Sequence, residues 1–224
     1  MEVNGICKSY GKKQVLKKIS FLTEPGKCIG LIGANGCGKT TLLKLMAGVE
    51  KADAGQILIE GKPFAGGEKE LRGKIGYVPQ ENVLMEELSV KDNLKLFATL
   101  SGKKIQEEYV RLLCEQFSVT GFMKEKVSRL SGGMKKRVSI VCAMIGRPEI
   151  LILDEPSAAL DLVFKEELKA CIRAFTKAGG CVVLSSHDKG EIENCDLLFA
   201  MKNGELTAVD KEMSMEAMVE KYIR

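Results

Sequence analysis

Short apolar runs recur along the chain between clusters of Gly, Pro and charged residues, and they predict buried strands. The runs are too short for helices, and strands covered on both faces of a parallel sheet are apolar at consecutive positions. Five such runs are Cys28–Ile32, Ile75–Val78, Ile150–Leu153, Cys181–Leu184 and Leu197–Met201. They predict the strands of a parallel sheet.

The N-terminal part of the chain has a different pattern, in which short alternating segments are separated by turn residues. Val3 to Tyr10, Val15 to Leu22 and Gln56 to Glu60 are expected to be antiparallel strands, the last followed by a turn at Gly61-Lys62-Pro63. A small antiparallel layer is therefore predicted beside the parallel sheet. Asn203-Gly204 is a hairpin turn signal near the other end of the chain.

Apolar residues at helical spacing predict an insertion of helices in the middle of the chain. Ser89 is a suitable N-cap for a helix through Leu100, and Gln106 to Phe117 has the same periodicity. A longer helix is expected to open at Ser131-Gly132-Gly133 and to end near Gly146. Its predicted buried face carries Val138, Val141, Cys142 and Ile145.

Two more helices are expected towards the C-terminus, an amphipathic one over Phe164 to Thr176 and a surface one over Ser214 to Ile223. Strands that alternate with helices predict an α/β fold with helices on both faces of the sheet. We expect a single domain, 1–224, with a core at 1–85 and 136–224 and a helical subdomain inserted at about 86–135.

Composition changes this picture little. The chain is 45% hydrophobic, and its 34 Lys and Arg against 30 Asp and Glu give a net charge of +4 with the two signs interspersed. This balance argues against a nucleic-acid partner. The eight scattered cysteines form no C-x-x-C pair, so zinc and a disulfide framework are not expected, and the reducing cytosol is the favoured compartment.

The sequence also argues against a membrane-spanning or secreted protein. The N-terminus lacks a basic-then-apolar signal pattern, and the apolar runs fall short of the roughly 18 residues that span a bilayer. Any membrane-spanning part of the system is expected to be a separate polypeptide.

A glycine-rich stretch between the first buried run and the next helical pattern carries the chemistry. It reads Gly33, Ala34, Asn35, Gly36, Cys37, Gly38, Lys39, Thr40 and Thr41. The spacing fits G-x-x-x-x-G-K-[ST], in which the backbone N–H groups and the start of the helix cradle phosphates. Lys39 is expected to reach the β- and γ-phosphates and Thr40 to ligate Mg²⁺. The stretch predicts binding of a nucleoside triphosphate.

Two carboxylates follow the run Ile150–Leu153. Asp154, at the end of a buried strand, is placed to hold Mg²⁺ and its waters. Glu155 is placed to polarise the water that attacks the γ-phosphate, which favours a hydrolase over a simple binder.

These motifs together with Leu130-Ser131-Gly132-Gly133 resemble the ATP-binding cassette (ABC) ATPases, and the resemblance covers about residues 2 to 210. The Leu-Ser-Gly-Gly segment distinguishes this family from other P-loop proteins and disfavours a P-loop kinase. The resemblance implies a RecA-like P-loop NTPase fold, ATP and Mg²⁺ as cofactors, and a dimer of ATPase subunits with ATP at the interface.

The resemblance also implies roles for individual residues. Tyr10 resembles the aromatic residue that stacks on adenine, and Gln80 resembles the glutamine that contacts Mg²⁺ and water. His187, the single histidine, resembles the histidine that contacts the γ-phosphate. Ser131, Gly132 and Gly133 resemble the signature that reaches the partner's γ-phosphate across the dimer, and Ser157 to Asp161 resemble a loop at that interface.

One position departs from the family pattern. Met134 stands where the signature most often carries Gln, so it offers no amide to the partner's nucleotide. We expect a weakened contact across the dimer and not a loss of activity.

The sequence therefore predicts the ATPase subunit of a transporter with a separate transmembrane permease, bound at the cytoplasmic face of the membrane through that permease. The segment around His187 looks most like small bacterial exporter ATPases, so export is favoured. A soluble ATPase of iron–sulfur cluster assembly is the alternative. Ser131 follows Lys39 by only 92 positions, without a heptad run between them, which argues against the chromosome-maintenance relatives.

Overall fold

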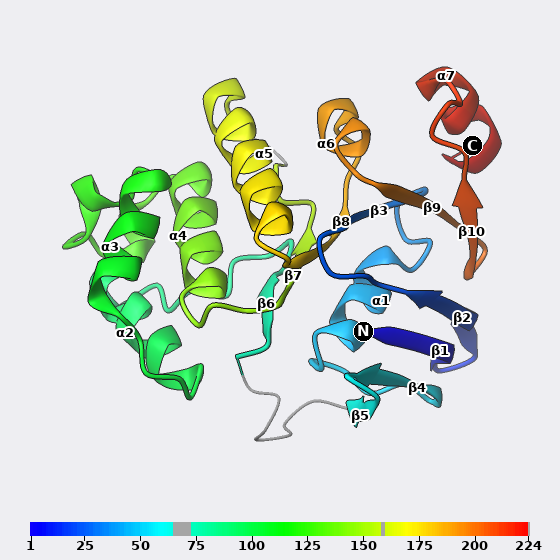
Figure 1. Cartoon of the computed structure of the whole chain (residues 1–224), viewed down its shortest axis with the longest axis horizontal. Helices are drawn as coiled ribbons and strands as arrows, with labels where there is room; N and C mark the ends of the chain where they lie inside the picture. Colours follow the sequence, from blue (N-terminus) through cyan, green and yellow to red (C-terminus); the bar gives the residue numbers. More distant parts are fainter. Residues whose placement is uncertain (65–72, 158–159, 224) are drawn as a thin grey trace.

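The computed structural model describes residues 1–64, 73–157 and 160–223 (Figure 1). Its larger sheet has the strand order β10-β9-β3-β8-β7-β6. The strands are β3 (Cys28–Ile32), β6 (Ile75–Val78), β7 (Ile150–Asp154), β8 (Cys181–Ser185), β9 (Leu197–Lys202) and β10 (Glu205–Val209). All neighbours pair in parallel except β9 and β10, which form a hairpin. The predicted parallel sheet is confirmed.

The second sheet is antiparallel and has the order β2-β1-β4-β5. Its strands are β1 (Glu2–Tyr10), β2 (Lys13–Leu22), β4 (Ala54–Ile59) and β5 (Lys62–Phe64). The prediction that Gly61-Lys62-Pro63 is only a turn was wrong, because the chain turns at Glu60-Gly61, both at positive φ, and then pairs as β5. Pro63 is tolerated there because β5 is an edge strand.

Seven α-helices are assigned in the described residues. They are α1 (Lys39–Met46), α2 (Val90–Leu100), α3 (Glu107–Gln116), α4 (Gly132–Met144), α5 (Leu162–Lys177), α6 (Lys189–Glu193) and α7 (Met215–Met218). Short helical turns are η2 (Thr120–Phe122), η3 (Val127–Arg129) and the π-helical η4 (Val219–Ile223). The expected N-caps are confirmed, since Ser89 and Ser131 accept hydrogen bonds from the N–H groups of Asp92 and Met134.

The helices differ from the prediction at three points. Helix α6 was not predicted, because five residues are too few to show a helical period. The expected surface helix over Ser214 to Ile223 is a single α-turn followed by a π-turn, and Met218 within it is buried. Helix α4 buries Ser139, Ile140 and Met144 as well as the predicted face, because it packs against both α2 and β6.

Successive residues of the parallel strands point into two different apolar cores. Ile150 and Ile152 of β7 face a core shared with α1 and the antiparallel sheet, whereas Leu151 and Leu153 face a core shared with α4 and α5. This alternation follows from the two-residue period of a strand. It explains why the strands are apolar throughout and why both faces of the sheet are covered.

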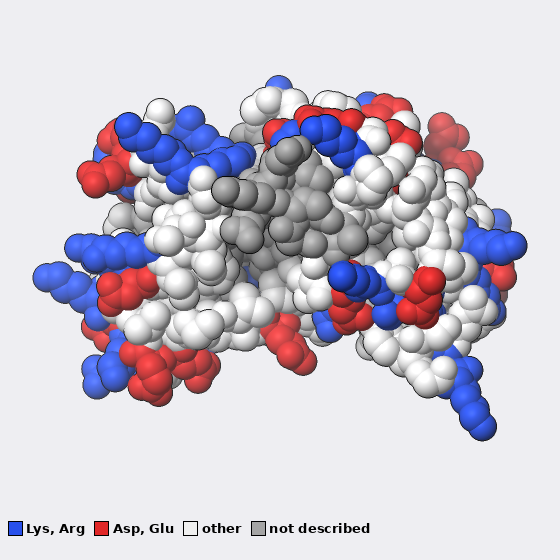
Figure 2. All heavy atoms as spheres, turned by 90° about the horizontal axis from the view of Figure 1, so that it is seen from below, with Lys and Arg blue, Asp and Glu red and all other residues white. Residues whose placement is uncertain are grey.

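Helices α2, α3 and α4 lie together at one end of the molecule, away from the antiparallel sheet (Figure 1). Helices α2 and α3 fall within the expected insertion at about 86–135, whereas the expected boundary at 135–136 falls inside α4. None of the helices assigned in the described ranges has both the length and the apolarity to cross a bilayer. Lys and Arg lie interspersed with Asp and Glu on the face in Figure 2. The pair Gly66-Gly67, which is typical of a loop, lies outside the described residues.

Candidate functional site

The ends of four neighbouring parallel strands carry most of the predicted site residues. The glycine loop follows β3, Gln80 follows β6, Asp154 ends β7 with Glu155 directly after it, and His187 follows β8. Because the carboxyl ends of parallel strands meet at one edge of a sheet, these groups come together there.

A cavity of about 670 Å³ lies at this edge, within the size range of ligand pockets. The predicted site residues that line it are Tyr10, Asn35, Gly36, Gly38, Lys39, Thr40, Thr41, Gln80, Glu155 and His187. It has room for a nucleotide, and we call it the nucleotide cavity. Ala34 and Cys37 instead line a neighbouring cavity of about 570 Å³ on another side of the loop.

The glycine loop needs residues without side chains where it crosses other parts of the chain. Gly33 has φ +151°, and a Cβ atom built on it would lie 2.3 Å from the carbonyl oxygen of Met201. Gly38, at φ +119°, is the N-cap of α1, and a Cβ atom built on it would lie 2.9 Å from the side chain of Leu16. The loop therefore keeps its path, with the first turn of α1 directed at the nucleotide cavity, only while these positions are glycine.

Lys39 is folded into its own loop. Its side-chain ammonium donates hydrogen bonds to the carbonyl oxygens of Gly33 (2.7 Å) and Ala34 (3.3 Å), and it lies 3.4 Å from Nε2 of His187. Only 7% of the residue is exposed. A positive charge is thus held where the loop would receive an anion, as the sequence predicts.

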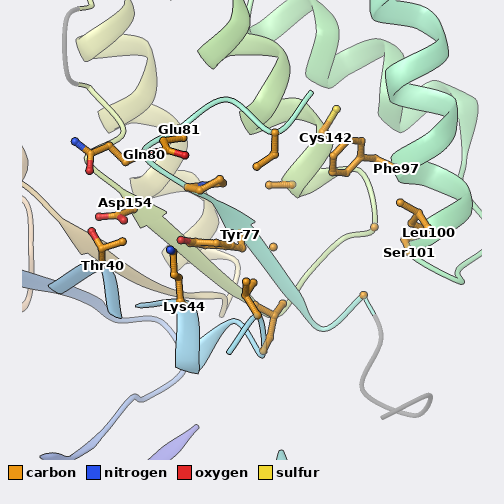
Figure 3. A pocket seen from close by; sticks show the side chains of 18 residues that line it. Thr40, Lys44, Tyr77, Gln80, Glu81, Phe97, Leu100, Ser101, Cys142 and Asp154 are labelled. Atoms are coloured by element: carbon orange, nitrogen blue, oxygen red, sulfur yellow. The ribbon is translucent and has the colours of Figure 1, made fainter. Parts of the chain in front are cut away.

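One carboxylate oxygen of Asp154 is hydrogen-bonded, and the other has no partner among the described residues. The residue is fully buried, Oδ1 accepts a hydrogen bond from the Ser185 hydroxyl (2.6 Å), and Oδ2 has no partner among the described residues. A buried carboxylate oxygen in this state is costly unless an ion or water joins it. Asp154, Thr40 and Gln80 line one cavity of about 580 Å³, and Figure 3 shows the three side chains converging. Their oxygens fit the donor set that Mg²⁺ prefers.

Glu155 has a strained backbone and faces His187. Its φ is +47°, which is uncommon outside glycine. Its N–H donates to both oxygens of Ser185, and its Oε1 lies 3.3 Å from Nε2 of His187. The predicted base and the predicted phosphate-contacting histidine therefore lie side by side at the nucleotide cavity.

Tyr10 lines the open part of the nucleotide cavity. Its ring is about half exposed, and its hydroxyl donates to a carboxylate oxygen of Glu50. Partial burial and the neighbouring Glu50 raise the pKa of Tyr10. An aromatic face held in this way is available for stacking on a base.

The signature residues lie apart from the nucleotide cavity of their own chain. Ser131 and Gly132 are exposed at the N-terminus of α4. Within the described residues, Ser131 to Gly133 are not among those that line the nucleotide cavity. The interface loop expected at Ser157 to Asp161 includes Ala158 and Ala159, which lie outside the described residues.

Sequence reasoning missed two residues at the site. Tyr77, on β6, has a buried hydroxyl without a partner among the described residues, and Figure 3 shows its oxygen directed towards Thr40 and Asp154. Burial, and then the charge of Asp154, raise its pKa. Ser185 is the second missed residue. The signal available in the sequence was its position at the end of the strand that precedes His187.

Comparison with known proteins agrees with this geometry. Residues 16–158 match the ABC transporter family. The chain is 34% identical over 227 residues to the Nod factor export ATP-binding protein I of Rhizobium sp. (strain N33), covering 100% of this chain and 73% of that protein. It is 32% identical to the linearmycin resistance ATP-binding protein LnrL of Bacillus subtilis (strain 168), covering 93% and 68%.

Solved structures have the same fold. An ATP-binding subunit of an ABC transporter superposes with a TM-score of 0.85 at 29% identity, covering 99% of this chain and 92% of the other. A dimeric ATP-binding cassette in a post-hydrolysis state, bound to ADP and phosphate, superposes with a TM-score of 0.83 at 23% identity, covering 95% and 99%.

Proposed function

Because this chain belongs to the ABC transporter family, as an ATP-binding and ATP-hydrolysing subunit, we propose that it powers export through a separate membrane-spanning subunit. One observation carries the site assignment, namely that Lys39, Glu155 and His187 meet at a single cavity beside Asp154. Both relatives reported above are named for export or drug resistance, which supports the direction of transport.

In the proposed mechanism each residue acts on one part of the nucleotide. Tyr10 stacks on adenine, the N–H groups of the glycine loop hold the phosphates, and Lys39 leaves its own loop to pair with the β- and γ-phosphates. Glu155 accepts a proton from the attacking water, and His187 donates to the γ-phosphate.

Asp154, Thr40 and Gln80 are the residues that would hold Mg²⁺. When bound, Mg²⁺ supplies charge neutralisation at the β- and γ-phosphates. Support for this role comes from Oδ2 of Asp154, which has no partner among the described residues, and from the shared cavity of the three side chains.

A second ATPase subunit is proposed to complete the site. Ser131 and Gly132 are exposed and Gly133 is half-buried, and the three lie outside the lining of their own nucleotide cavity, at a helix N-terminus whose partial positive charge suits an anion. Supplied by a partner, they would close on the γ-phosphate. The related cassette bound to ADP and phosphate is itself a dimer.

Met134 gives a test of that interface. Restoring glutamine (Met134→Gln) is expected to raise kcat/KM for ATP about two- to tenfold, the effect of one added hydrogen bond. Met134→Leu is the matched control, because it keeps the packing of Met134 against the core without adding an amide. Steady-state ATPase assays of the three proteins make the comparison, and a fall in the Gln variant would contradict the proposed contact.

The docking site for the membrane subunit is proposed to be the cavity of Figure 3. One end holds Thr40 and Asp154, and the other lies between β6 and helices α2 and α4, where Phe97, Leu100 and Cys142 make it apolar. A partner helix placed there would touch both the core and the helical subdomain, which we assign to about residues 86–135. Movement of the partner helix would then be coupled to the state of the other end of the cavity, where Thr40 and Asp154 would hold Mg²⁺.

Leu100 tests this docking site, because 63% of it is exposed and it lines the cavity. Burying a leucine contributes about 1.5–3 kcal/mol, so Leu100→Glu is expected to weaken association with the membrane subunit about tenfold or more. Basal ATPase activity is expected to stay unchanged. Leu112→Glu is the control, since Leu112 is similarly exposed on α3 and lies outside the cavity lining. Equal effects of the two variants on co-purification would argue against the site.

Co-purification also tests the proposed function as a whole. Recovery of the chain from membranes with an integral membrane protein is expected, which would place it at the cytoplasmic face through that partner. Recovery with soluble iron–sulfur assembly partners would instead support the alternative. That alternative has no counterpart in the names of the two relatives above.

A further inference from the structure

Ser185 lies at the centre of the catalytic edge without a role in the mechanism described so far. It is the last residue of β8 and pairs in register with Asp154, the last residue of β7. None of its surface is exposed. A hydroxyl buried this deeply is expected to have specific partners.

The Ser185 hydroxyl has two partners, and the two bonds have fixed directions. The backbone N–H of Glu155 can only donate, so Oγ of Ser185 accepts from it (3.0 Å). The hydroxyl proton is then free to go to Oδ1 of Asp154 (2.6 Å). One side chain therefore connects the two acidic residues at the end of β7, Asp154 within the strand and Glu155 directly after it.

The hydrogen bond from the Ser185 hydroxyl to Asp154 decides which oxygen Asp154 offers to a metal. Oδ1 is held by the Ser185 hydroxyl, so Oδ2, which has no partner among the described residues, is the oxygen left for Mg²⁺. Figure 3 shows the Asp154 carboxylate beside Thr40. Without the hydroxyl the carboxylate could rotate and present either oxygen.

The hydrogen bond from the Glu155 N–H to the Ser185 hydroxyl holds the backbone from which the Glu155 side chain projects. A φ of +47° is unfavourable for glutamate and persists only when surrounding contacts fix it. The N–H of Glu155 is fixed by the hydroxyl and the carbonyl oxygen of Ser185. In this conformation the carboxylate reaches His187 (3.3 Å).

We propose that Ser185 is a positioning residue for ATP hydrolysis, whose single hydroxyl aims Asp154 at Mg²⁺ and holds Glu155 towards the γ-phosphate. The inference rests on the proposed roles of Asp154 and Glu155. Loss of a group that orients a metal ligand typically costs about 10- to 100-fold in metal affinity or activity.

The test compares Ser185→Ala with Ser185→Thr, which keeps a hydroxyl, in the full chain. Ser185→Ala is expected to lower kcat and to raise the Mg²⁺ concentration for half-maximal binding of a fluorescent ATP analogue, each by about 10- to 100-fold. Affinity for the analogue in EDTA is expected to stay within about twofold of wild type, and the Thr variant to restore both Mg²⁺-dependent values to within about threefold. Ser139→Ala removes another buried hydroxyl, bonded to the Lys135 carbonyl, and is the control.

Two results would overturn the proposal. One is an Ala variant with the kcat and Mg²⁺ dependence of the wild type, and the other is an equal loss of nucleotide affinity with Mg²⁺ and in EDTA, which indicates a general structural role. If the Ala variant does not fold, Ser185→Cys takes its place, because it preserves the volume but its thiol is a weak hydrogen-bonding group. A wild-type chain without ATPase activity would reject the proposed function, whereas the Mg²⁺ titration would still test Ser185.

Discussion

The Glu155→Gln variant is expected to hydrolyse ATP about 100- to 10 000-fold more slowly than the wild-type chain while still binding it, because the amide cannot accept a proton from water. The substitution keeps the size of the side chain and leaves the backbone bonds of Glu155 to Ser185 in place. The proposed binding of nucleotide through Lys39 and of Mg²⁺ through Asp154 is expected to be unaffected. The variant is therefore expected to accumulate as an ATP-bound dimer.

Two measurements check this prediction. A coupled ATPase assay gives the rate, and light scattering with and without ATP and Mg²⁺ gives the oligomeric state. Glu193→Gln is the control, because Glu193 lies on α6 and pairs only with the exposed Lys189 among the described ion pairs. Substantial steady-state turnover by the Glu155→Gln protein would refute the assignment of the base.

The Lys39→Ala variant is expected to lose ATP binding and turnover together. A hydrogen bond between charged groups contributes about 1.5–3 kcal/mol, so losing one raises the dissociation constant roughly 10- to 150-fold. The effect on turnover is larger, because the charge of Lys39 is also missing where the γ-phosphate becomes more negative. In the structure the Lys39 ammonium lies against its own glycine loop, 2.7 Å from the carbonyl oxygen of Gly33.

Titration with a fluorescent ATP analogue and an ATPase assay measure the two losses. Lys95→Ala, which removes an exposed lysine on α2, is the control for charge alone. Thermal unfolding identifies any loss of fold, since the variant also removes the bonds from Lys39 to Gly33 and Ala34. A folded Lys39→Ala protein with wild-type affinity would show that the loop binds phosphate without its lysine.

Predictions that depended on adjacent residues were the most successful. The strand, glycine loop and helix around Gly33–Thr41 were predicted from one continuous stretch, and the structure has β3 followed by α1. The N-caps Ser89 and Ser131 were predicted for the same reason, because a cap bonds to an N–H three residues away. The apolar runs predicted the buried strands, because each strand is covered by an apolar core on both faces.

Short or edge elements were missed for an equally physical reason. Strand β5 contains Pro63 and helix α6 has five residues, so neither carries enough of a period to be recognised. The burial of Ser139, Ile140 and Met144 on α4 was also missed, because the second covered face depends on where β6 lies. Local pattern does not report which element packs against which.

The sequence by itself determined the phosphate-binding loop, the pair of carboxylates and the signature segment, because each is a short run whose chemistry depends on residues next to one another. The tertiary structure decided which residues from other parts of the chain contact these groups. Strand β8 lies between β3 and β7. That order of strands places Ser185 beside Asp154 and Glu155, and His187 beside Lys39. Such contacts join residues far apart in the chain, and only the pairing of the strands brings them within hydrogen-bonding distance.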